Sequence, residues 1–343
     1  MTSQTARSPS RRHTMQAMAA SAQTTSYEPL TPLMAVRLAA PHTWPGPAVL
    51  TTVFGGVYAI ACGYAFSPVI WCLLLAVAVF AQSAVNTLND WADYRAGTDT
   101  VENSDDPTDA VLVYNNPNPR SVLALGLAYM LVALVCGITC VVWSGSAIPL
   151  LIGVVGALFI VCYSSGKLPI SYFPLGELAS GIVMGALIPL ADICVFAAHA
   201  YPDAGLFGMP WPVDWLRLVS CLAPFVIGIG MVMATQNNCD IERDVPVGRK
   251  TLPVVLGRAR SVIVYRVFVV LWIAIVLHCA FWYFSAGFWA ACVTLVFGIG
   301  AMRSLLTTPL THEVRGPAMG TIMKANLFFN GALIMAMMVS LIG

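Results

Sequence analysis

The sequence contains few charged residues. Only 10% of its 343 residues are Asp, Glu, Lys or Arg, whereas soluble domains carry about 25%. Hydrophobic residues make up 58% of the chain, and the mean hydropathy is +0.79. Several apolar runs approach the ~20 residues that a membrane-spanning helix needs. The scarcity of charge therefore argues against a soluble protein and predicts an all-α polytopic membrane protein.

The sequence also lacks the cysteine patterns of a disulfide framework or a zinc site. Its ten cysteines are scattered, with no CxxC pair, so we interpret them as small apolar side chains inside a helix bundle. Residues 1–32 are rich in Ser, Thr, Ala and Gln, and no apolar segment typical of a signal peptide follows them directly. We expect a disordered cytoplasmic tail over 1–32 and one intramembrane domain over 33–343.

Nine apolar stretches are candidate membrane-spanning helices, at 45–66, 69–88, 122–143, 147–162, 175–198, 216–234, 262–279, 288–302 and 325–342. With the N-terminus placed in the cytoplasm, nearly all Lys and Arg residues fall in cytoplasmic segments, and only Arg217 lies toward the outside. This bias is the positive-inside pattern of membrane proteins. It predicts that the segments 89–120, 163–174, 237–261 and 303–324 face the cytoplasm.

Two acidic clusters follow apolar runs, and we call residues 86–99 the first arm and residues 237–244 the second arm. Their candidate site residues are Asn86, Asn89, Asp90, Asp93, Asn237, Asp240 and Asp244. The aspartates of each arm are spaced i,i+3 or i,i+4, so on a helix each pair shares one face. Acidic side chains at the end of a membrane span are costly and tend to mark function. Mg²⁺ favours such hard oxygen ligands and completes its shell with water and substrate phosphate.

Cationic and aromatic residues lie close to these arms in the sequence, and each has two interpretations. Arg120 either clamps a phosphate through its guanidinium or anchors a helix end. Tyr163 and Lys167, at i,i+4, either point into one site or sit at the membrane interface. Arg249 and Lys250 either bind a diphosphate or act only as topology markers.

Two further acidic residues stand apart from the arms. Glu177 begins a predicted span, where it is either a favourable charge at a helix N-terminus or a catalytic group. Asp192 lies inside the same span, and a lone aspartate there is a functional candidate without an assigned role.

Three motifs, taken in order, resemble the UbiA superfamily of intramembrane prenyltransferases, and most closely its 1,4-dihydroxy-2-naphthoate polyprenyltransferases. The motifs are Asn89-Asp-Trp-Ala-Asp93 with Gly97-Thr-Asp99, Tyr163 through Pro169, Tyr172 and Gly176-Glu177, and Asn237-Asn-Cys-Asp240-Ile-Glu-Arg-Asp244 with Gly248-Arg-Lys-Thr-Leu252. The resemblance extends from about residue 37 to the C-terminus. It implies about nine helices around a central cavity with cytoplasmic cap loops.

The resemblance also implies an activity. Two Mg²⁺ ions held by Asp90, Asp93, Asp240 and Asp244 would bridge a polyprenyl diphosphate, with Tyr163 and Lys167 assisting. Further substrate contacts are expected from Asn86, Asn89, Arg120, Tyr172, Asn237, Arg249 and Lys250. The expected product is demethylmenaquinone, formed with loss of CO₂ and diphosphate.

Two alternatives remain open from the sequence. One is a UbiA-type enzyme with another acceptor, such as 4-hydroxybenzoate. The other is a cation-coupled transporter. Transporters tend to carry broken helices near the bilayer midplane, whereas these carboxylates cluster at one surface, so the sequence favours the enzyme.

Overall fold

The computed structural model describes residues 27–97, 99–100, 110–164, 170–207, 214–246 and 248–342. Its principal helices are α2 (Pro32–Ala39), η2 (Pro45–Leu50), α3 (Thr51–Ala61), α4 (Pro68–Ala96), α5 (Val111–Asn115), α6 (Pro119–Ser144), α7 (Ile148–Ser164), η3 (Ile170–Tyr172), α8 (Gly176–Ile182), η4 (Val183–Leu187), α9 (Ile188–Ala200), α10 (Trp215–Cys239), α11 (Ile241–Asp244), α12 (Leu252–Leu256), α13 (Arg258–Tyr283), α14 (Phe288–Phe297), α15 (Ile299–Thr307) and α16 (Arg315–Ser340). In these ranges the only extended pairing is one bridge between Glu28 and Pro117. The predicted all-α class is confirmed.

Six helices in the described ranges are long and apolar enough to cross a membrane. A seventh span results if α14 and α15, which are bent by 53° between residues 297 and 299, are taken together. Two further apolar helices, Pro45–Ala61 and Ile148–Phe159, are shorter than the ~20 residues of a full span. The prediction of nine spans is therefore not confirmed as a count, although each predicted range coincides with a helical segment.

Gly298 lies at the bend between α14 and α15 and packs closely against α16. A Cβ atom at this position would lie 2.9 Å from Cβ of Phe328 and 3.0 Å from Cε1 of Phe329 on α16. The glycine therefore lets the bent segment approach α16 closely, where any larger residue would push the two apart.

The two arms belong to helices that extend past their predicted spans. Helix α4 continues to Ala96 and ends at Gly97, whose φ of 74° is the left-handed cap that glycine favours. Helix α10 continues to Cys239 and ends at Asp240. Because α4 is helical through Asp90 and Asp93, these two aspartates lie on one helical face, as their spacing predicts.

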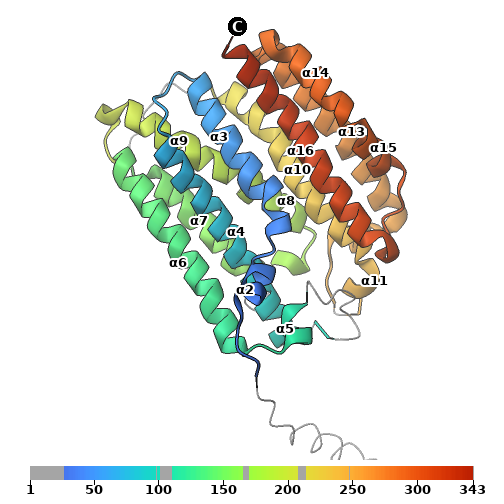
Figure 1. Cartoon of the computed structure of the whole chain (residues 1–343). Helices are drawn as coiled ribbons and strands as arrows, with labels where there is room; N and C mark the ends of the chain where they lie inside the picture. The colour runs from blue at the N-terminus through green and yellow to red at the C-terminus, as the bar shows by residue number, and fades with distance from the viewer. Residues whose placement is uncertain are drawn as a thin grey trace, which may run out of the picture.

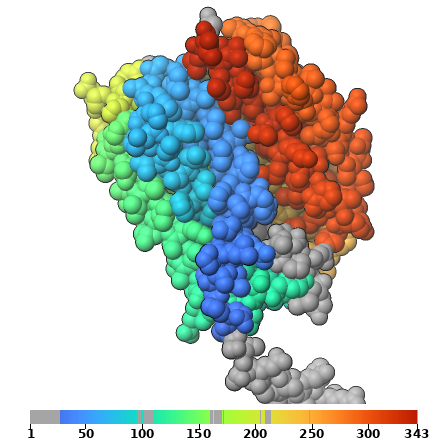
Figure 2. Space-filling model, in the orientation of Figure 1, coloured from blue at the N-terminus to red at the C-terminus, as the bar shows by residue number. Residues whose placement is uncertain are grey.

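The helices form one bundle whose N-terminal and C-terminal halves lie side by side (Figures 1 and 2). In the first half α4 packs along α6, and in the second α10 packs against α13 and α16. A buried polar network joins these last three helices: Trp272 Nε1 donates to Asn330 Oδ1 (2.8 Å), and Asn326 Nδ2 donates to the Gly228 carbonyl (3.0 Å). The short helices α2, α5 and α11 gather at one end of the bundle.

Glycines allow α8 and η4 to approach α10 at backbone distance. A Cβ atom at Gly181 would lie 2.5 Å from the Val226 carbonyl oxygen, and one at Gly185 would lie 2.5 Å from that of Phe225. This close contact joins the halves of the bundle and sets the segment beginning at Gly176 beside the last turns of α10.

Candidate functional site

The first arm occupies the final turns of α4, where Asn89, Asp90 and Asp93 lie beyond the predicted end of the span. Asn86, one turn earlier, faces the N-terminal segment. Its Nδ2 donates to the Ala39 carbonyl and to Thr43 Oγ1, both at 3.0 Å. In this structure Asn86 thus ties the end of α2 to α4, and its predicted contact with substrate stays a prediction.

The second arm begins at the C-terminus of α10 and turns into α11. Asp240 is anchored from the far end of the chain: Arg315 Nε lies 3.1 Å from both of its carboxylate oxygens, and His312 Nδ1 lies 3.7 Å from Oδ1. Asp244 is buried at the end of α11, where its Oδ2 accepts a hydrogen bond from Thr251 Oγ1 at 3.0 Å. The tertiary fold thus adds α16 to the two predicted arms.

Arg249 brings the two arms together. Its Nη2 donates to Asp93 Oδ1 at 3.1 Å, and its Nη1 lies 3.9 Å from Asp244 Oδ1. The same guanidinium lies over the ring of Tyr172, 5.3 Å from its centroid. One cation therefore contacts carboxylates from both arms and an aromatic ring from η3, which favours the site interpretation of Arg249 over a topology marker alone.

The remaining predicted residues are distributed unevenly around this centre. The backbone N–H of Lys250 donates to the Tyr172 carbonyl at 3.0 Å, so the second arm's basic loop is fastened to η3. Arg120 is exposed in the first turn of α6. Tyr163 lies in the last turn of α7, but its side chain and all of Lys167 lie outside the described residues.

Burial weakens the acidity of two carboxyl groups near Arg249. Burial of the Asp244 side chain raises its pKa to about 6, against the opposing effects of Thr251 and Arg249. Burial, together with the neighbouring Asp93, likewise raises the pKa of Asp99 to about 6. A group whose charge is penalised in this way gains from a bound cation, because opposite charge favours the ionised form.

The carboxylates of the two arms suit a divalent cation that takes part of its ligands from the bound substrate. Among the described residues no three His, Cys, Asp or Glu side chains converge as a complete metal site. Mg²⁺ takes one or two carboxylates and fills its octahedral shell with water and phosphate oxygens. The aspartates fit this requirement, since a single guanidinium already contacts carboxylates of both arms.

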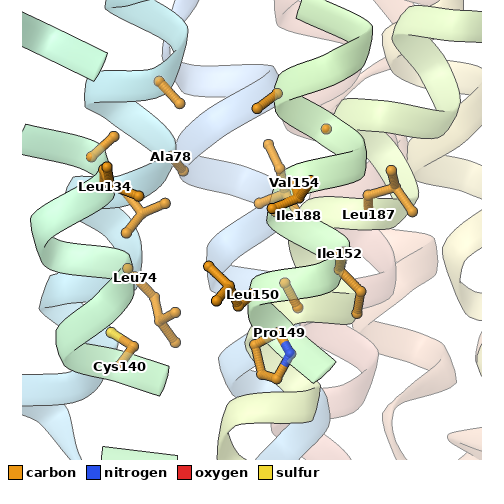
Figure 3. Close-up of a pocket in the computed structure, with 18 of the residues that line it drawn as sticks. Leu74, Ala78, Leu134, Cys140, Pro149, Leu150, Ile152, Val154, Leu187 and Ile188 are labelled. Carbon is orange, nitrogen blue, oxygen red and sulfur yellow. The ribbon is translucent and has the colours of Figure 1, made fainter. Parts of the chain in front are cut away.

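An apolar cavity of about 280 Å³ lies between α4, α6, α7 and α9 (Figure 3). Along α4 its lining runs from Leu74 to Val85, about 16 Å at 1.5 Å per residue, and ends about 8 Å short of Asp90. Leu74, Cys140 and Pro149 gather at one end of it, away from Leu134 and Val154. The cavity thus leads along α4 toward the first arm.

Four further residues around the arms had little or no signal in the sequence. Arg315 and His312 reach Asp240, and Thr251 reaches Asp244. Glu177, noted only as a helix-start charge, accepts a hydrogen bond from Asn237 Nδ2 at 2.8 Å. Glu177 could have been identified from its place in the middle motif. Arg315 lies 75 residues from Asp240, and no local pattern in the sequence marks it as a partner of that residue.

Known proteins share both the sequence pattern and the fold. The family model described as the UbiA prenyltransferase family matches residues 48–315. The protein named 1,4-dihydroxy-2-naphthoate octaprenyltransferase from Bacillus subtilis is 29% identical over 231 residues, covering 66% of this chain and 67% of that protein. The protein of the same name from Mycobacterium tuberculosis is 30% identical over 199 residues, covering 57% of this chain and 60% of that protein.

Solved structures agree on the architecture. The apo structure of a UbiA homolog from Aeropyrum pernix has a TM-score of 0.58 at 15% identity, covering 84% of this chain and 96% of that one. A UbiA homolog from Archaeoglobus fulgidus bound to DMAPP and Mg²⁺ has a TM-score of 0.56 at 13% identity, covering 88% and 98%. Since the family model spans most of the chain, this integral membrane protein belongs to the UbiA prenyltransferase family and is an enzyme that transfers prenyl groups.

Proposed function

We propose that the protein transfers a polyprenyl group from a polyprenyl diphosphate to 1,4-dihydroxy-2-naphthoate. CO₂ and diphosphate leave, and demethylmenaquinol is formed, the hydroquinone that a later oxidation converts to demethylmenaquinone. The observation that carries this proposal is the contact of Arg249 with Asp93, Asp244 and Tyr172, which brings one carboxylate of each arm, a cation and an aromatic ring together. The names of the two relatives, at 29% and 30% identity, support the naphthoate acceptor.

Two Mg²⁺ ions are assigned to Asp90, Asp93, Asp240 and Asp244. Mg²⁺ in the donor-bound Archaeoglobus homolog supports the choice of metal. When bound, the ions would neutralise the charge that develops on the leaving diphosphate. Arg249 contacts Asp93 and Arg315 contacts Asp240, and we expect these guanidiniums also to bind the diphosphate, whose oxygens suit their bidentate geometry.

The other polar residues bind and orient the substrates. Lys250, Lys167 and Arg120 supply positive charge for the diphosphate or for the acceptor carboxylate. Tyr163, Asn89 and Asn86 are assigned to the donor side. Tyr172, whose ring lies under Arg249, and Asn237, which donates to Glu177, are assigned to the side of the site that binds the aromatic acceptor.

The apolar cavity beside α4 suits the hydrocarbon part of the donor. Its lining is almost entirely aliphatic, and along α4 it ends at Val85, about 8 Å short of Asp90. Such walls keep water from the electron-poor allylic carbon until the acceptor ring attacks it. The four polar segments at this end of the bundle, and with them the N-terminus, are assigned to the cytoplasmic face of the cell membrane, as the Lys/Arg asymmetry predicts.

The test supplies purified protein with octaprenyl diphosphate, Mg²⁺ and carboxyl-labelled 1,4-dihydroxy-2-naphthoate. We expect label to leave as CO₂ while demethylmenaquinol forms, which is measured as demethylmenaquinone after oxidation in air, and we expect EDTA to stop both. Asn substitutions at Asp90, Asp93, Asp240 or Asp244 are expected to abolish turnover while the protein still inserts. Prenylation of 4-hydroxybenzoate with no reaction of the naphthoate would assign another acceptor of the same family.

A further inference from the structure

Glu177 is a half-buried carboxylate beside the arms to which the proposed function assigns no role. It lies in the first turn of α8, and its Oε1 accepts the hydrogen bond from Asn237. Its Oε2 is fully shielded from solvent and, among the described residues, has no hydrogen-bond partner. A buried carboxylate oxygen without a donor is costly, so such an atom indicates a missing partner.

The position of Glu177 is set by the backbone rather than by a flexible loop. The packing of Gly181 and Gly185 against α10 holds α8 at contact distance, and Cβ at Gly230 would lie 3.0 Å from the Glu177 carbonyl oxygen. Asn237 then fixes the carboxylate from α10, one turn before Asp240. Rigid placement of this kind is what a group acting on a substrate atom requires.

The surroundings of Glu177 match an aromatic acceptor. Only four residues separate Tyr172, whose ring lies under Arg249, from Glu177. Glu177 is also close enough to Asp244 for its charge to contribute to the raised pKa of that residue. An acceptor beside Tyr172 would therefore place an anionic group near Arg249 and a hydroxyl group near Glu177.

We propose that Glu177 is the catalytic residue that accepts the acceptor's hydroxyl proton, with Asn237 as its positioning residue. This inference rests on the proposed function. The ring carbon that bears the carboxylate, next to the hydroxyl, attacks the allylic carbon, and a C–C bond forms. The C–O bond between the allylic carbon and the diphosphate breaks, and its electron pair stays on the diphosphate. The hydroxyl proton passes to Glu177 Oε2, which leaves a ketone beside the new bond.

The later steps return the proton. The bond to the carboxylate breaks, CO₂ departs, and the electron pair moves through the ring to the ketone oxygen. That oxygen takes the proton back from Glu177, which completes the hydroquinone. Atoms and charge balance without an oxidant or reductant, and the residue ends in its starting state.

The decisive variant is Glu177→Gln, because its amide oxygen still accepts the Asn237 hydrogen bond while the basic oxygen is lost. With octaprenyl diphosphate and 1,4-dihydroxy-2-naphthoate, we expect kcat to fall about 100-fold or more, the range of general base catalysis. The KM for the donor and the melting temperature are expected to stay near wild type. Glu177→Asp is expected to recover part of kcat, and Glu313→Gln, at an exposed glutamate paired with Thr311, serves as the control.

A substrate analogue separates contact with the hydroxyl from a structural role. The acceptor methylated on the hydroxyl next to the carboxyl-bearing carbon is measured as a competitive inhibitor. It should inhibit wild type and Glu177→Gln equally, whereas the naphthoate itself distinguishes them. A Glu177→Gln enzyme with kcat within threefold of wild type, or with only the donor KM raised, would overturn the assignment.

The proposed acceptor and this assignment fail separately. If wild type transfers the prenyl group to another hydroxylated arene, the acceptor proposal is wrong and the same variants are compared on that arene. Loss of kcat in Glu177→Gln there still supports the proton role, and unchanged kcat rejects it.

Discussion

At the scale of single residues, Arg249 is the pivot of the site. It contacts one carboxylate of each arm and the ring of Tyr172, while its own backbone N–H donates to the Asp244 carbonyl at 3.0 Å. The loop that carries it is thus pinned to the second arm, and its side chain reaches across to the first. An arginine suits this position because its planar fork serves two anions at once.

Arg249→Ala should destabilise the metal-free protein, because Asp93 and Asp244 lose their shared cation. A hydrogen bond to a charged group contributes about 1.5–3 kcal/mol, and partial solvent contact of both side chains reduces this, so we expect a loss of about 1–2 kcal/mol. The measurement is thermal unfolding in EDTA, with the exposed Arg260→Ala as control. Added Mg²⁺ should narrow the difference, and equal melting temperatures in EDTA would contradict the bridging role.

The raised pKa of Asp244, about 6, determines the direction in which the stability of the protein changes with pH. Between pH 4 and 6 the folded protein holds a proton at this residue that the unfolded chain has released, so stability from Asp244 is lost as pH rises through this window. Asp244→Asn removes the effect and keeps an oxygen for Thr251. We expect the variant to gain more melting temperature over wild type in EDTA at pH 7.5 than at pH 5.

Bound Mg²⁺ should stabilise the wild-type protein most at the pH where Asp244 is ionised. The ionised form of Asp244 is the one that binds a cation, so the stabilisation of wild type by Mg²⁺ should be greater at pH 7.5 than at pH 5. A variant whose advantage over wild type in EDTA is the same at both pH values would show that Asp244 is not protonated near pH 6.

At the scale of elements, the close contact of α8 and η4 with α10 positions the acceptor side of the site. Without side chains at Gly181 and Gly185, the two backbones touch, and Glu177 meets Asn237. The π-helical turn of η4 and the proline at the start of α9 interrupt the regular α-helix within this one span. The element's shape thus follows from a few residues with unusual backbone requirements.

Gly181→Ala should separate α8 from α10, because its methyl group would lie 2.5 Å from the Val226 carbonyl oxygen. Overpacking of this kind costs about 1–3 kcal/mol. The melting temperature should fall, and the KM for the acceptor should rise as Glu177 moves away from Asn237. Gly300→Ala on α15 is the matched control, since no atom lies within 4 Å of its added methyl group and the residue does not line the apolar cavity. Equal effects of the two substitutions would exclude the close contact as the cause.

At the scale of the whole molecule, the arms meet because four segments end on the same side of the bundle. Asp93, Tyr172, Arg249 and Arg315 come from four of the segments predicted to be cytoplasmic, and contacts join them directly or through Asp240 and Asp244. Segments that touch one another share one face of a membrane. The orientation of that face is therefore a single choice, which the Lys/Arg asymmetry assigns to the cytoplasm.

Single reporter cysteines in a cysteine-free background test that orientation. Val245 in the second arm's turn and Leu206 at the opposite end are 58% and 55% exposed, so both suit labelling. A membrane-impermeant maleimide applied to intact cells should label Leu206→Cys and leave Val245→Cys unmodified until the membrane is opened. The reverse pattern would place the site outside and contradict the topology.

The amino-acid sequence by itself determined the class, the family and the two arms. Hydropathy and charge follow directly from composition, and the spacing of Asp90 and Asp93 is a local property of one helix. The predicted count of nine spans was not confirmed. Hydropathy does not show the bend near Gly298 or the shortness of the helices at 45–61 and 148–159. Local patterns establish that a segment is apolar and helical, but its length across the membrane depends on packing.

Only the tertiary structure decided which residue serves which carboxylate. The sequence singled out Arg249 as a candidate and not Arg315, yet both contact the arms: Arg249 bridges Asp93 to Asp244, and Arg315 holds Asp240. Glu177 and Asn237, 60 residues apart, meet because glycines bring α8 and α10 together. Ion pairs and hydrogen bonds act over a few ångströms, so partners distant along the chain are chosen by helix packing, which leaves no local trace in the sequence.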